Sequence, residues 1–217
     1  MLQKMLYDIA DHFPLSALET GEYRKLKVSG MNFEIQSYHA SGLGHVSIMC
    51  ARGFFGLMKM DTLIINPTEK DMPLFSYDRV HAMGNDTLIF ELYDTLIGAA
   101  NLSLLEQAKA NAAALPEHNL GEHWYDSIKL PVSLSKKGRR KHRTAFNSTV
   151  DQYLEAYLFS AEDAADCEKT QKLEKASVYV EGLLEHGGPS TDVFKKGIGD
   201  EKTAQLFRTV LFGTMNA

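Results

Sequence analysis

Six short segments with strand-like patterns, between about residues 23 and 94, limit the fold of this chain more than any other feature. They are RKLKV, NFEIQSYH, HVSIMCA, LMKMDTLII, LFSYDRVHA and TLIFELY, and Ser-Gly, Gly-Leu-Gly and Met-Gly-Asn-Asp sequences separate several of them. Short runs of this kind are typical of β-strands, and tight Gly-containing connections are typical of hairpins. The pattern therefore predicts an antiparallel meander.

The rest of the chain has mainly helical periodicity. Apolar residues from Leu2 to Phe13 recur at helical spacing and stop at Pro14, and four further helical segments are predicted over 98–115, 149–164, 167–188 and 200–213. Strands that come first and helices that come afterwards predict an α+β fold with a mostly antiparallel sheet. No segment has the composition of a linker, so we expect a single domain over residues 1–217.

Composition narrows the class of protein. A net charge of −5, from 23 basic and 28 acidic residues, gives no indication of a nucleic-acid partner. The only cysteines, Cys50 and Cys167, are far apart, which excludes a metal site with four cysteines of this chain and suits a reducing cytoplasm. The N-terminus interrupts its apolar pattern with Asp8 and Asp11, and no apolar run is long enough to span a membrane. We therefore expect a cytoplasmic protein without a membrane segment.

One carboxylate lies in an apolar part of the predicted sheet. Asp78 is inside LFSYDRVHA, and side chains alternate between the two faces of a strand. The residues expected on its face, if the Met-Gly-Asn-Asp hairpin has an even-numbered loop, are Leu74, Ser76, Val80, Ile89, Glu91 and Tyr93. Whether Asp61 shares that face depends on the register across an eight-residue loop, which the sequence leaves open.

Two interpretations of these acids follow. Asp61, Asp78 and Glu91 could simply lie on a solvated face of the sheet. Alternatively, burial among apolar side chains raises the pKa of a carboxyl group, and a second carboxylate nearby raises it further. Such a group holds its proton near neutral pH and can donate it to a substrate.

Motifs for common cofactors are absent from the sequence. There is no GxGxxG after a strand, no GxxxxGK[ST] and no GxSxG, and HNLGEH (118–123) fits no zinc-protease pattern. We therefore expect no metal and no bound cofactor, and any electrons must come from another molecule. The basic run KKGRRKHR (136–143) is either a solvated loop, a docking site for an acidic protein, or a site for anionic groups of a substrate.

Two segments resemble the ferredoxin-dependent bilin reductases. MPLFSYDRV, followed by the strand TLIFELYDTL, keeps the proline, phenylalanine, aspartate and valine of a family strand, with Ser76 in place of a glycine. Asp78 coincides with the aspartate that protonates the bound bilin in that family. GGPSTDVFKKGIGDEKTAQLFRTVLFG is similar to the C-terminal end of the family, where Asp192 matches a second proton donor. Asp61 and Met49 differ from the histidine and glutamate of the phycocyanobilin-forming branch.

The resemblance implies a three-layer α/β/α sandwich with a central, mostly antiparallel sheet. It also implies reduction of biliverdin or a related linear tetrapyrrole by a radical mechanism, as in phycobilin biosynthesis, with electrons taken singly from ferredoxin or flavodoxin and no bound cofactor. Asp78 is then the principal proton donor, Asp192 the second, and Asp61 an orienting acid. The residues expected to contact the substrate are Met60, Ser76, Glu91 and Tyr93, and those expected to dock the donor are Lys136, Lys137, Arg139 and Arg140.

The sequence also allows other functions, and several further residues are candidates for the site. The alternatives are a non-catalytic bilin or haem carrier on the same scaffold, and a reductase similar to the chlorophyll-catabolite enzymes. Trp124 and Tyr125 are candidates for either the pocket or the core. His81 and His123 are weaker candidates for substrate contact. Arg79 is expected on the opposite face of its strand from Asp78.

Overall fold

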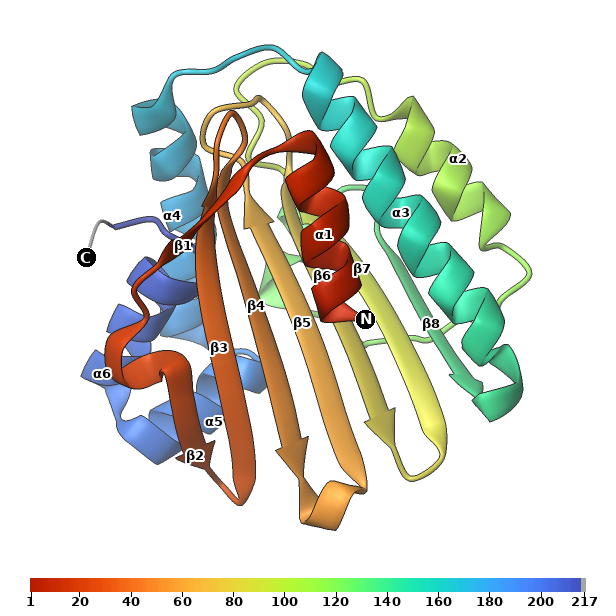
Figure 1. Ribbon diagram of the computed structural model, residues 1–217, viewed down its shortest axis with the longest axis vertical. Coiled ribbons are helices and arrows are strands. Elements are labelled where there is room, and N and C mark those ends of the chain that lie inside the picture. Colours follow the sequence, from red (N-terminus) through yellow and green to blue (C-terminus); the bar gives the residue numbers. More distant parts are fainter. Residues whose placement is uncertain (216–217) are drawn as a thin grey trace.

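The computed structural model describes residues 1–215 and contains one eight-stranded sheet with helices on both sides (Figure 1). The strands are β1 (Leu15–Leu18), β2 (Lys25–Val28), β3 (Met31–Ala40), β4 (Gly44–Gly53), β5 (Met58–Asn66), β6 (Leu74–Ala82), β7 (Asn85–Tyr93) and β8 (Leu134–Arg139). The helices are α1 (Leu2–His12), α2 (Ser103–Asn111), α3 (Arg143–Asp163), α4 (Lys169–His186), α5 (Pro189–Ile198) and α6 (Asp200–Gln205), and a π-helical turn, Leu206–Leu211, continues α6.

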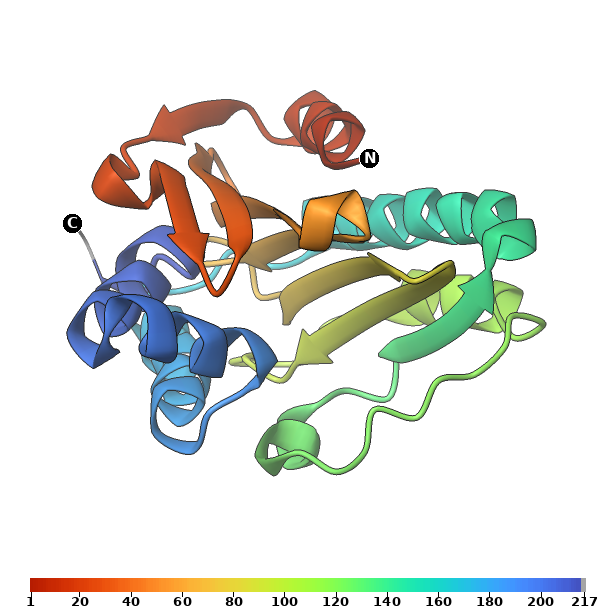
Figure 2. The ribbon, with the colours of Figure 1, turned by 90° about the horizontal axis from the view of Figure 1, so that it is seen from below.

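The sheet confirms the predicted α+β sandwich. Its strand order is β1-β3-β4-β5-β6-β7-β8, with β2 also paired to β3, and every pairing is antiparallel. The hairpin between β6 and β7 has the two-residue loop Met83-Gly84, in which both residues have positive φ. This is the conformation of the tight turns that match the twist of hairpin strands. Figure 2 shows α1 and α3 on one side of the sheet and α4 to α6 on the other.

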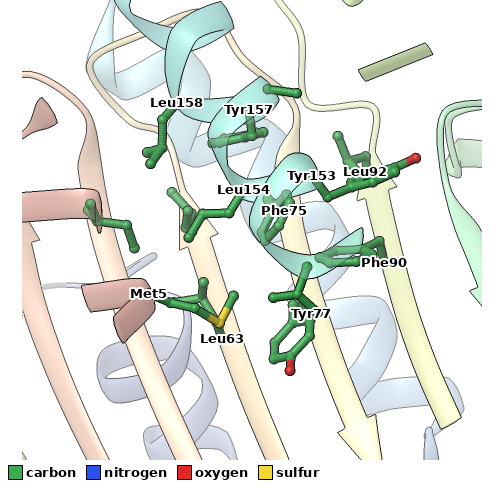
Figure 3. Close-up of a cluster of buried hydrophobic side chains, with 14 of the residues drawn as sticks. Met5, Leu63, Phe75, Tyr77, Phe90, Leu92, Tyr153, Leu154, Tyr157 and Leu158 are labelled. Carbon is green, nitrogen blue, oxygen red and sulfur yellow. The ribbon is translucent and has the colours of Figure 1, made fainter. Parts of the chain in front are cut away.

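An aromatic core fills the space between the sheet and helices α1 and α3 (Figure 3). Phe90 stacks on Tyr153 of α3 with ring centroids 4.5 Å apart. The ring centroids of Phe75 and Tyr157 are 4.8 Å apart. The Tyr157 hydroxyl donates a hydrogen bond to the Pro73 carbonyl, so the buried phenol is not left unpaired. This packing fixes α3 against the centre of the sheet.

A second core lies on the opposite face of the sheet, beneath α4, α5 and the C-terminal turn. It joins alternate residues of the strands, such as Phe33 and Ile35 of β3, to Phe194, Phe207 and neighbouring side chains. The central strands β4 to β7 have few exposed residues on either face, as expected for the central layer of three.

The structure departs from the sequence prediction in several elements. The edge strands β1 and β8 and the helix α5 were not predicted from the periodicity, and β8 includes the first part of the basic run, for which a solvated loop was one interpretation. The helix predicted over 98–115 occupies only α2, because the backbone N–H groups of Ile97 and Gly98 donate to the Asp71 carboxylate and hold the preceding segment outside a helix. No helix in the described part of the chain, residues 1–215, has the length and apolar character needed to cross a membrane.

Candidate active site

A cavity opens between the sheet and the C-terminal helices. Its floor is formed by alternate residues of the central strands, among them Met60, Thr62, Ser76, Asp78, Ile89 and Glu91. Its volume is about 200 Å³. A mostly apolar lining with a few polar groups is typical of a small-molecule site.

One wall of the cavity is the C-terminal turn, which polar side chains hold against the sheet. Ser37 Oγ and Ser47 Oγ donate to the carbonyls of Val210 and Leu211 over 2.6 and 2.7 Å, and Asn66 Nδ2 donates to the Phe212 carbonyl over 2.7 Å. These bonds satisfy carbonyls that the end of a helix leaves without partners. They position Phe207 and Leu211 over the cavity.

Asp78 lies on β6 in the cavity floor, directly opposite Thr62 of β5 and Ile89 of β7. The Thr62 hydroxyl donates a hydrogen bond of 2.5 Å to Asp78 Oδ1. Burial raises the pKa of the Asp78 carboxyl from 3.8 to about 6, the Thr62 hydrogen bond opposes this rise, and the nearby Glu91 carboxylate adds to it. The carboxyl group therefore titrates close to neutral pH, as a proton donor requires.

Glu91 provides a second carboxylate on the same face. It lies opposite Ser76 across the β6–β7 pair, and its Oε2 accepts a hydrogen bond of 2.7 Å from the Tyr93 hydroxyl. Its Oε1 is buried without a hydrogen-bond partner and lies 3.7 Å from Lys129 Nζ, beyond hydrogen-bond distance. The Tyr93 ring stacks on Tyr179 of α4 with centroids 4.0 Å apart, which fixes this end of the cavity. Glu91 is therefore placed to accept a hydrogen bond from a ligand.

The loop before β8 forms another side of the cavity, through Leu120, His123 and Tyr125. The His123 ring stacks on Tyr125, with centroids 4.9 Å apart and planes at 11°. Its Nδ1 atom is buried and has no hydrogen-bond partner within residues 1–215. A buried polar atom without a partner is uncommon in a folded protein and here points to a ligand that supplies one.

The structure brings together most residues that the sequence placed in the site. Met60, Ser76, Asp78, Glu91 and Tyr93 all line the cavity. The expectation that an even-numbered hairpin loop puts Ile89, Glu91 and Tyr93 on the face of Asp78 is confirmed by the pairing of β6 with β7. Of the aromatic candidates, Tyr125 lines the cavity and Trp124 packs outside its lining, against Gly182 of α4.

The assignment of Asp61 as an acid that orients Asp78 is wrong. Asp61 pairs with Arg79, and Thr62 pairs with Asp78, so Asp61 points to the opposite face of the sheet. There it is buried, with Lys59 Nζ at 2.8 Å and the Cys50 thiol donating to its Oδ1 over 3.3 Å. Arg79 also lies on that face, as expected, and pairs with Asp86. The side chain of β5 that contacts Asp78 is Thr62, and it is the register of β5 against β6 that places it there.

Asp192 does not line the cavity either. It lies in the first turn of α5, where its side chain is exposed and its carboxylate lies against Gly187, whereas its neighbour Thr191 is buried and lines the cavity. His81 is also absent from the lining residues. It lies on the same face of β6 as Arg79, with its Nδ1 atom 3.2 Å from Asp86 Oδ1. Neither side chain reaches the cavity in this conformation.

The basic run divides into one buried and several exposed cations. Lys136 is only 3 % exposed and pairs with Glu117 while donating to the Leu115 carbonyl, so its assignment to a docking surface is wrong. Strand alternation turns Lys136 toward the α3 side and leaves Lys137 and Arg139 on the cavity side of the sheet edge. Lys137, Arg139 and Arg140 are exposed, in agreement with a surface site.

These features define a three-layer α/β/α protein with an acid-containing cavity on one face of an antiparallel sheet. No protein-family model matches the chain, and no curated protein is significantly similar to it in sequence. Among solved structures, it is similar to phytochromobilin synthase from tomato in complex with biliverdin, with a TM-score of 0.80 at 16 % identity, over 98 % of this chain and 82 % of that one. The chain therefore has the fold of that synthase.

Proposed function

We propose that the protein binds a linear tetrapyrrole, biliverdin or a related bilin, in this cavity and reduces it with electrons from an external ferredoxin or flavodoxin. The observation that carries the proposal is the Asp78 carboxyl, with its pKa raised to about 6, in the floor of an otherwise largely apolar cavity. The fold supports it, since the tomato enzyme of the same fold was solved with biliverdin.

Asp78 would supply a proton as the bilin accepts electrons. With a pKa of about 6, roughly one carboxyl in ten is protonated at pH 7, against about one in 1,600 for a pKa of 3.8. A bound tetrapyrrole would displace water from the cavity and raise the pKa of Asp78 further. The Thr62 hydroxyl would then hold the carboxyl in one orientation while its proton moves to the pigment.

The other cavity residues would bind and orient the substrate. Glu91 Oε1, which has no hydrogen-bond partner among residues 1–215, is suited to accept a hydrogen bond from a pyrrole N–H. Met60 and Ile89 would pack against the flat face of the conjugated rings. The Ser76 hydroxyl lies on the same face, opposite Glu91, and would contact the polar edge of the pigment.

The electron donor would dock at the edge of the sheet that carries the exposed cations Lys137, Arg139 and Arg140. Lys137 pairs with Thr87, which pairs with Val80 of the cavity lining. Two strand spacings of about 4.8 Å put the backbone of Lys137 about 10 Å from that of Val80. Met83, which is 88 % exposed at the neighbouring hairpin, would add an apolar contact. An acidic donor would therefore approach close to the pigment.

Addition of biliverdin to the purified protein tests binding, and a shifted absorption band is the expected result. Addition of ferredoxin, its reductase and NADPH should then bleach and blue-shift that band. Asp78→Asn should bind the pigment and lose at least 100-fold in turnover, the usual range for removal of a general acid. A spectral shift without reduction would indicate a carrier, and the lack of any shift would reject both functions.

A further inference from the structure

The second proton of the reaction needs a source that Asp78 does not provide. Reduction of one double bond consumes two electrons and two protons, and the external donor supplies only electrons. Asp192, the residue expected from sequence to give the second proton, is exposed on α5 and outside the cavity lining. The inference that follows rests on the proposed function and concerns this second proton.

His123 is the cavity residue best placed to provide it. Among the described residues that line the cavity there is no lysine or arginine that could donate a proton. The two carboxyl groups of the lining, Asp78 and Glu91, both belong to the floor. His123 reaches the cavity from the loop before β8, so it would meet a different part of the pigment from Asp78. Histidine is the side chain that most often acts as a general acid, and it donates its proton through a ring nitrogen.

The surroundings of His123 fit proton delivery more closely than a packing role. Its Nδ1 is buried without a hydrogen-bond partner among residues 1–215, although the ring lines the cavity. Stacking on Tyr125, which itself packs edge-on against Tyr93, restricts the ring to one plane. The imidazole is therefore held in one orientation beside the cavity, with a ring nitrogen that no described residue uses.

We infer that His123 is the second proton donor of this site. In the complete step, the bilin accepts two electrons, one at a time, from the external donor, while Asp78 and the His123 imidazolium each transfer one proton to it. Two new bonds to hydrogen form on the pigment and one double bond is lost. Asp78 and His123 are then left deprotonated and regain their protons from solvent.

His123→Gln tests the inference, with two matched variants. His118→Gln makes the same substitution five residues earlier in the same loop, at a position outside the cavity lining, and Asp192→Asn tests the competing donor. Each variant is titrated with biliverdin, assayed with ferredoxin, its reductase and NADPH, and followed by absorption spectra of the bound pigment from pH 5 to pH 9. A thermal melt verifies that each variant is folded.

His123→Gln should keep biliverdin affinity within about threefold, lose about 100-fold in turnover and lose one pH-dependent transition of the bound pigment's spectrum. His118→Gln and Asp192→Asn should stay within about threefold of the wild type in turnover. Normal turnover of His123→Gln, a loss of pigment binding in that variant, or a large loss in Asp192→Asn would each overturn the inference. Absence of pigment binding by the wild-type protein would instead reject the proposed function itself.

Discussion

Asp78→Asn should make the pigment-free protein more stable above neutral pH, because the folded state holds the ionised carboxylate in an apolar cavity. The pKa of Asp78 is raised in the folded state to about 6 from the ordinary value of 3.8. Between pH 3.8 and about pH 6 the folded state binds more protons than the unfolded state, so the free energy of unfolding falls as pH rises. Asparagine has no charge and keeps an oxygen that accepts the Thr62 hydrogen bond, so it removes this dependence.

The size of the effect follows from the shift. A difference of about 2.2 pH units, at 1.36 kcal/mol per unit, gives a stabilisation of about 3 kcal/mol at pH 8, where the carboxyl is ionised in both states. The difference should fall to about 0.5 kcal/mol at pH 4. For a chain of this length, about 3 kcal/mol corresponds to a rise in Tm of roughly 6–12 °C.

Urea unfolding of the wild type and Asp78→Asn at several pH values between 4 and 8 measures this difference directly. Asp192→Asn is the matched control, since it makes the same substitution at an exposed carboxylate outside the cavity. Equal stabilities of the wild type and Asp78→Asn at pH 8, or a difference that does not vary with pH, would refute the claim that burial raises the pKa of Asp78 in the folded state. Because no pigment is present, the result does not depend on the proposed activity.

Further perturbations test other parts of the structure. Thr62→Val removes a hydrogen bond to the ionised form of Asp78, worth about 1.5–3 kcal/mol, and should move the pH–rate profile about one to two units to higher pH; an unmoved profile would contradict the geometry. The double variant Arg139→Glu and Arg140→Glu should raise the KM for ferredoxin at least tenfold and reduce its salt dependence without changing kcat at saturation, and an unchanged KM would place the dock elsewhere. Lys172 of α4 is buried, with its Nζ 3.2 Å from Oδ1 of the buried Asp71. Lys172→Met removes this ion pair and should cost about 3–5 kcal/mol of stability in urea unfolding, whereas a loss below 1 kcal/mol would show that the ion pair is not needed.

Much of the fold could be predicted because its signals are local. The alternation of buried and exposed residues along β3, and the two-residue turn between β6 and β7, fix which side chains share a face within a strand and within a hairpin. These local rules were sufficient to put Glu91 and Tyr93 beside Asp78. The order of strands and helices was sufficient for the three layers once the resemblance to the bilin reductases was added.

The remaining features depended on contacts between distant parts of the chain. The register of β5 against β6 is set across a loop of several residues, and a shift by one residue exchanges the faces, so the sequence alone did not decide whether Asp61 or Thr62 lies beside Asp78. Likewise, the sequence of the basic run does not indicate that it pairs with β7. This pairing buries Lys136 and leaves its neighbours exposed.

The sequence by itself determined the class of fold and the acid at the centre of the site, because periodicity and short turns act over a few residues. Only the tertiary structure decided what surrounds that acid: the Thr62 hydroxyl, the unpartnered Nδ1 of His123 and the C-terminal turn that forms a wall. These groups come from segments up to about 150 residues apart, and their meeting depends on packing and register, for which no single stretch of sequence carries the signal.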